Sequence, residues 1–129
     1  MFDPKNELTI SVMQPSTAKT ANWNSSVIDV QQYQGTCAVI MNAGAKTAGD
    51  TADTTLDARL YGSAESNGAN AVILNNNFAQ VTTANSYQVI QHDPRSTGLR
   101  YLKAVAIIDG TNSPSFPVSM TFIGQKKLQ

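Results

Sequence analysis

The sequence predicts an all-β protein, namely an antiparallel β-sandwich, jelly-roll-like, with eight or nine short strands. Three observations lead to this fold class. Turn-forming residues recur about every ten positions, several stretches between them alternate apolar and polar side chains, and no longer window has the 3.6-residue period of an amphipathic helix. Short strands at such spacings are typical of sandwiches and jelly rolls.

The expected turns are rich in glycine, proline, asparagine and aspartate. Glycine permits positive φ, proline fixes φ, and the side chains of asparagine and aspartate bond to nearby backbone groups. The turn signals lie at Pro15-Ser16-Thr17, Gly44 to Asp53, Asn67-Gly68, Asp93-Pro94, Gly98 and Asp109 to Pro114.

Three of the expected strands alternate with period two, as strands with one buried face do. They are Leu8 to Val12, Thr54 to Ser63 and Phe116 to Ile123. In the second of them Leu56, Ala58 and Leu60 share one side, and both charged residues, Asp57 and Arg59, share the other. This arrangement indicates a sheet with one solvated face.

Two further segments are almost wholly apolar. Thr36 to Ala43 is interpreted as a strand covered on both faces, and Arg100 to Ile108 as a core strand that buries Leu102 and Val105. Weaker strand candidates lie at Val27 to Val30, Ala71 to Leu74, Phe78 to Thr82 and Tyr87 to Gln91.

The length of 129 residues predicts a single β-sandwich domain over 1–129, with 1–7 and 125–129 as candidate arms. Nine basic and nine acidic residues cancel, and only 14% of positions are charged. Such a neutral chain has no electrostatic footprint for nucleic acid or anionic membrane. No apolar run approaches the length of a membrane span, and the first residues lack the layout of a secretory signal. We therefore expect neither nucleic acid nor membrane as a partner.

The residues that carry most enzyme chemistry are scarce. Cys37 is the single cysteine, which excludes an internal disulfide and favours synthesis in a cytosol. It lies in an apolar run, where a cysteine behaves as a small buried hydrophobe, so a nucleophilic pair with His92 is not expected. His92 and Asp93 are adjacent, and adjacent side chains of a strand point to opposite faces. We expect no enzymatic activity and no catalytic residues.

No cofactor or metal site is expected either. Asp50, Asp53 and Asp57 do not have the spacing of a calcium-binding EF-hand loop and are interpreted as a solvated acidic turn. The chain also has no glycine-rich phosphate-binding loop.

Four apolar residues are candidates for a protein interface. Trp23 and Tyr33 lie in polar neighbourhoods, where an aromatic residue can anchor a partner protein or pack in the core; both alternatives stay open. Phe2 and Leu128 lie in the two candidate arms, each of which either reaches a neighbouring subunit or frays.

The C-terminal third carries a series of short sequence motifs. Leu99 to Ala106 reads Leu-Arg-Tyr-Leu-Lys-Ala-Val-Ala, and it precedes Gly110-Thr111, Ser113 to Phe116, Val118-Ser119 and Ile123-Gly124. The middle of the chain adds the segments Val39 to Gly44, Thr55 to Leu60 and Asn77 to Thr82. Over residues 36 to 124 the chain resembles small virion proteins of tailed bacteriophages, of the capsid decoration (cement) protein type.

This resemblance implies a structural protein on the capsid exterior, made in the host cytoplasm. Its expected partners are the major capsid protein and itself, as a small homo-oligomer, and its expected role is to stabilise the head. Uncharged Ser, Thr, Asn and Gln, 34% of the chain, suit repeated protein contacts, because they bond without the desolvation cost of charges. The alternatives are a carbohydrate-binding β-sandwich that aids host adsorption, or another head or tail component.

Overall fold

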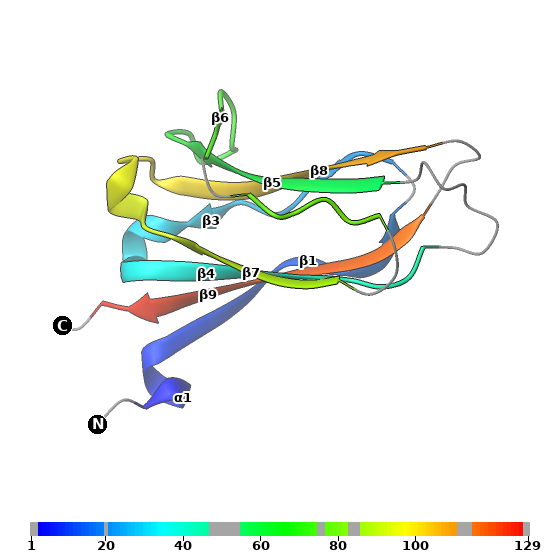
Figure 1. Ribbon diagram of the computed structural model, residues 1–129. Coiled ribbons are helices and arrows are strands. Elements are labelled where there is room, and N and C mark those ends of the chain that lie inside the picture. Colours follow the sequence, from blue (N-terminus) through cyan, green and yellow to red (C-terminus); the bar gives the residue numbers. More distant parts are fainter. Residues whose placement is uncertain are drawn as a thin grey trace.

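The structure is a computed structural model that describes residues 3–19, 21–46, 55–74, 77–82, 86–110 and 115–127. Within these ranges the chain forms nine strands in two antiparallel sheets, which lie one above the other in Figure 1. The predicted all-β sandwich with eight or nine strands is confirmed.

The first sheet, called the β4 sheet below, has the order β1 (Leu8–Lys19), β9 (Phe116–Lys126), β4 (Tyr33–Ala43), β7 (Ser86–His92). The second, called the β8 sheet, has the order β2 (Trp23–Asn24), β8 (Tyr101–Asp109), β5 (Thr55–Ser63), β6 (Val72–Ile73), and β3 (Ile28–Asp29) also pairs with β8. Three short helices complete the described elements: α1 (Pro4–Glu7), η1 (Val30–Gln32) and η2 (Pro94–Ser96).

The core fills the space between the two sheets with alternate residues of each strand. In β5 the predicted inward set of Leu56, Ala58 and Leu60 is buried. In β9 the predicted set is also fully buried, namely Phe116, Val118, Met120 and Phe122. The period-two pattern of these two strands therefore identified the core side correctly.

Chain segments close both open sides of the sandwich. On one side the Ser26 amide donates to the Met13 carbonyl at 2.9 Å, which ties the segment after β2 to β1. On the other, Leu56 and Val81 exchange two backbone hydrogen bonds of 2.9 Å each. The expected strand at Phe78 to Thr82 is reduced to this one bridge.

The predicted turn at Pro15-Ser16-Thr17 is wrong, because β1 continues through it to Lys19. The strand absorbs the proline through register shifts between Val12 and Gln14 and between Gln14 and Thr17. A proline has no N–H to donate, so it is tolerated on an edge strand and at a bulge.

The chain ends differ from simple arms where the structure describes them. Asp3 caps α1 by accepting a hydrogen bond from the Lys5 amide, and β9 extends through Gln125 and Lys126, which pair with β4. The interface candidates Phe2 and Leu128 lie outside the described residues.

The apolar run in β8 has two different faces. Leu102 is completely buried, as predicted, whereas Val105 lies on the opposite side of the strand, beside Asn24 and Arg59. Val105 is only half-buried, so its predicted place in the core is wrong. Like Val105, Ile107 faces outward, at 46% exposure.

Candidate protein interface

The alternating segment at the start of β1 has its apolar side turned away from the core. Ile10 is 66% exposed and Val12 is 60% exposed. Between them, Ser11 lies opposite Phe122, which is completely buried in the core. Directly opposite residues of an antiparallel pair share a face, so the polar side of this segment is the inner one. The usual orientation of an amphipathic strand is reversed here.

The neighbouring strands continue this apolar surface across the sheet. The register aligns Ile10 with Ile123 and Ala38 in one row, and Val12 with Thr121, Ile40 and Val89 in the next. We call the outer surface of the β4 sheet over these rows and the two rows that flank them the uncharged face. Its residues are Leu8, Ile10 and Val12 of β1, Ser119, Thr121, Ile123 and Gln125 of β9, Gln34, Ala38, Ile40 and Asn42 of β4, and Tyr87, Val89 and Gln91 of β7.

These rows hold no charged side chain, and they include four of the seven large hydrophobic residues that are exposed in the described part of the protein. On β7, Tyr87 is 67% exposed and Val89 is 51% exposed. In Figure 1 the uncharged face is the lower surface of the lower sheet, with α1 at the start of β1. Contiguous exposed apolar surface of this kind is typical of interaction sites.

The prediction that Thr36 to Ala43 is covered on both faces is wrong within this chain. Val39 and Met41 are completely buried, but Ala38 and Ile40 lie on the uncharged face and are only partly buried. Nothing in the described ranges packs over them, because the second sheet lies on the other side of β4.

The outer surface of the β8 sheet has the opposite character. The ladder of β5 and β8 places Asp57, Arg59, Lys103 and Asp109 on it, and Asp29 lies beside Tyr101 at its margin. Five charged residues therefore lie on or beside the outer surface of the β8 sheet, whereas the described side chains in the rows of the uncharged face include none.

Trp23 and Tyr33 lie in the core. Trp23 is 8% exposed and Tyr33 is 9% exposed. The Tyr33 ring packs against Phe122 with 5.1 Å between ring centroids, and it lies so close to Gly124 that a Cβ there would be 2.8 Å from the ring. Of the two alternatives for these aromatics, core packing is therefore the one that the structure describes.

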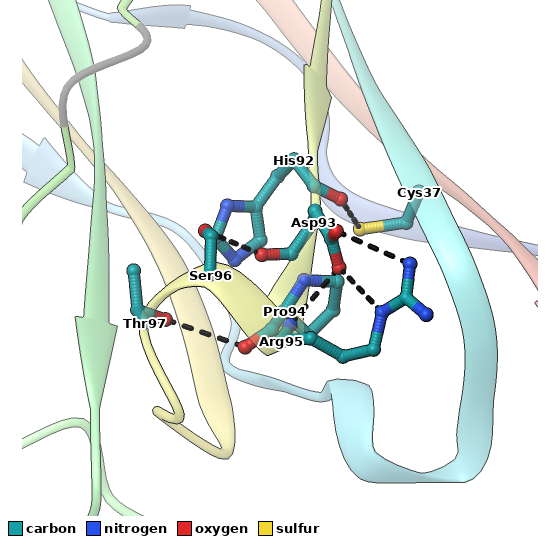
Figure 2. A network of polar contacts seen from close by, with 7 residues as sticks. All are labelled: Cys37, His92, Asp93, Pro94, Arg95, Ser96 and Thr97. Atoms are coloured by element: carbon teal, nitrogen blue, oxygen red, sulfur yellow. Dashed lines mark hydrogen bonds and ion pairs between the residues drawn. The ribbon is translucent and has the colours of Figure 1, made fainter.

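The Cys37 thiol donates a hydrogen bond to the backbone carbonyl of His92 at 3.2 Å, and the imidazole points away from it (Figure 2). Burial raises the pKa of the Cys37 thiol to about 11 and lowers the pKa of His92. The pair thus lacks the geometry and the thiolate that a nucleophilic site needs. Asp93 accepts hydrogen bonds from the amide and the guanidinium of Arg95 and caps the start of η2.

A hollow of about 430 Å³ opens at the end of the sandwich. Its wall includes Tyr33, Leu99 and the cationic side chains of Arg95, Arg100 and Lys127. Two of the cations already bind carboxylates: Arg95 binds Asp93 at 3.1 Å and Arg100 binds Asp29 at 2.8 Å. The Arg100 guanidinium holds the pKa of Asp29 below its ordinary value. The hollow therefore offers little unpaired charge to a ligand.

Among the described residues, no group of three or more His, Cys, Asp or Glu side chains has the geometry to hold a metal ion. Asp57 accepts a hydrogen bond from Gln80 at 3.0 Å, and Asp50 and Asp53 lie outside the described ranges. None of the helices in those ranges has the length and the apolar character needed to cross a bilayer.

The residues that sequence reasoning missed are those of the uncharged face. The signal was present in the alternation of Leu8, Ile10 and Val12 and in the spacing of Tyr87 and Val89. Period two shows which residues share a side, but strand pairing decides which side faces the core.

Known structures with a similar fold were found, although no protein-family model matches the sequence and no curated protein matches it. The protein YomS of the SPBc2 prophage has a TM-score of 0.55 and 15% identity, over 93% of this chain and 94% of its own. A cowpea mosaic virus top component chain has a TM-score of 0.47 and 12% identity, over 95% and 91% of the two chains. A xylan-binding domain of Paenibacillus barcinonensis Xyn10C has a TM-score of 0.48 and 16% identity, over 95% and 89%. At these identities the likeness to YomS shows a shared fold.

Proposed function

We propose that this protein is a structural protein of a tailed-phage virion and acts as a capsid decoration protein without enzymatic activity. In this role it binds the major capsid protein on the outside of the head, acts as a small homo-oligomer, and stabilises the shell. A decoration protein gains its strength from many identical modest contacts across the lattice.

The observation that carries the proposal is the uncharged face. Four large apolar side chains, those of Ile10, Val12, Tyr87 and Val89, are exposed on one surface, while the polar Ser11 points inward. On a monomer fully surrounded by water, this distribution is unfavourable and unusual. It is typical of a surface that another protein covers. The charged outer surface of the β8 sheet then supplies the solvated side.

Two further observations support a phage virion in particular. The Arg100 to Gly124 region resembles small virion proteins of tailed phages, and the fold is shared with a prophage-derived protein. The buried thiol of Cys37, with its raised pKa, favours a structural role over a catalytic one.

The experiment that tests this function compares the heat resistance of virions with and without the protein. Particles stripped of it are expected to release DNA at a lower temperature, and added wild-type protein is expected to restore the original temperature. Leu102→Asp, which destroys the core, serves as a control that should not restore it. Stripped particles as heat-resistant as intact ones would contradict the stabilising role.

A second candidate function, carbohydrate binding in host adsorption, is favoured by one observation. The β5–β8 register pairs Tyr61 with Lys103 and Tyr101 with Ser63, so the two tyrosines are diagonal neighbours on the outer surface of the β8 sheet. Both are half-buried, and the Arg100 guanidinium lies 5.2 Å from the Tyr101 ring centroid. Neighbouring aromatic rings on a sheet surface can stack against sugars.

A glycan array separates this function from the first one. If the protein binds glycans, Tyr61→Ala and Tyr101→Ala are expected to abolish binding, whereas Tyr87→Ala on the uncharged face should leave it unchanged. The absence of binding by the wild-type protein would eliminate the adsorption role.

A further inference from the structure

We propose that the uncharged face is covered by a second copy of this chain, so that two sandwiches pack with their β4 sheets face to face. This dimer rests on the proposed function, which includes a small homo-oligomer. It specifies the surface through which two copies meet and the way in which they stack.

The charge distribution permits this contact. In a two-fold symmetric interface the same patch meets itself, so any charge on it tends to approach its own copy. The uncharged face has no charged side chain in its rows, and self-contact therefore brings no like charges together. The outer surface of the β8 sheet, with Asp57, Arg59 and Lys103, would bring charges into such a contact.

The shape of the surface also fits a second copy. A twisted sheet is complemented well by another sheet of the same twist, and stacked sheets pack about 10 Å apart. The two sheets of this sandwich already pack face to face. The face carries large exposed side chains on both margins, Ile10 and Val12 on β1 and Tyr87 and Val89 on β7. Its middle strands contribute smaller or half-buried ones, such as Ala38 and Ser119.

Pairing by strand edges is interrupted on both margins of the β4 sheet, from Met13 to Pro15 of β1 and beside Gln88 of β7. On β1, Pro15 has no N–H, the register shifts twice, and the Met13 carbonyl already accepts from Ser26. Beside β7, the Gln88 amide accepts from the Ala79 N–H at 2.7 Å and donates to its carbonyl at 3.0 Å, which holds that segment beside β7. The broad surface left for a second copy is the face.

The size of the face predicts the strength of the contact. Four strands spaced ~4.8 Å apart, with about four outward rows spaced ~6.8 Å apart, cover roughly 520 Å² per copy. Two copies together would bury about 1,000 Å², at the small end of specific interfaces, where complexes are weak and depend on concentration. The dimer should therefore form reversibly and be reinforced when many copies gather on a lattice.

The test is the oligomeric state of the purified full chain, measured by analytical ultracentrifugation from micromolar to millimolar concentration. The variants are Val12→Lys and Val89→Lys, at opposite margins of the same row of the uncharged face. The matched control is Ile107→Lys, which places the same charge on an exposed residue of the other sheet. Circular dichroism establishes that each variant is folded.

Wild type and Ile107→Lys are expected to dimerise alike, and each face variant should weaken dimerisation by at least about tenfold, because each brings a charged side chain into an otherwise uncharged contact. A wild-type protein that stays monomeric throughout overturns the inference, as does equal dimerisation of all four proteins. A monomeric wild type that binds capsids, when Val12→Lys and Val89→Lys do not, assigns the face to the major capsid protein and leaves the decoration role standing. A dimer that fails to restore stripped virions contradicts the proposed function alone.

Discussion

At the scale of single residues, Cys37 and His92 lie opposite each other in the β4–β7 ladder without forming a chemical site. The thiol is bonded to a backbone oxygen, and both side chains are buried, at 3% and 8% exposure. Both side chains fill the end of the core. Their burial affects the reactivity of the thiol and the dependence of stability on pH.

The Cys37 thiol should be inert in the folded protein. Because its pKa is raised to about 11 and its exposed fraction is 3%, the reactive thiolate is both rare and inaccessible at neutral pH. A thiol-specific chromogenic reagent should label the native protein very slowly and the denatured protein at once. Rapid labelling of the native protein would mean that Cys37 is exposed.

His92, the single histidine, should make stability depend on pH in its own titration range. Burial lowers the pKa of His92 in the folded state below its ordinary value of 6.5, so the unfolded chain binds more protons there. The free energy of unfolding should therefore fall as pH drops through and below 6.5, the ordinary pKa of the imidazole. His92→Gln should flatten this slope in denaturant titrations, and an unchanged slope would contradict the burial of a neutral imidazole.

At the scale of elements, β5 and β9 could be predicted down to their inward residues, because their alternation and their pairing agree. β1 could be predicted as a strand but not in its orientation, since the side on which Ile10 and Val12 lie depends on pairing with β9. The apolar run of β4 predicts cover on both faces, but within the described chain only the side of Val39 and Met41 is covered. The sequence does not distinguish cover by the same chain from cover by another molecule.

The two faces of β8 can be tested by one pair of substitutions. Leu102→Asp should destabilise the protein by more than about 4 kcal/mol, because it buries an unpaired charge at a completely buried position. Val105→Asp should leave the protein folded, because Val105 lies outward beside Arg59. Thermal unfolding followed by circular dichroism measures both, and equal losses would contradict the assigned register.

At the scale of the whole molecule, the outer surface of the β8 sheet carries charged residues, whereas the described side chains in the rows of the uncharged face include none. Sequence composition indicated a neutral, polar chain, but it did not indicate that the charges are segregated, because Asp57, Arg59 and Lys103 come together only through the β5–β8 ladder. The segregation supports a protein that is covered on one side and solvated on the other. It is the physical basis for the proposed place of this protein in a virion.

The number of copies per particle tests the decoration role most directly. Quantitative mass spectrometry of purified virions, with the major capsid protein as internal reference, gives that number. A decoration protein should be present at a copy number comparable to that of the major capsid protein. A copy number that is only a small fraction of it would contradict the decoration role and point to a connector or tail component.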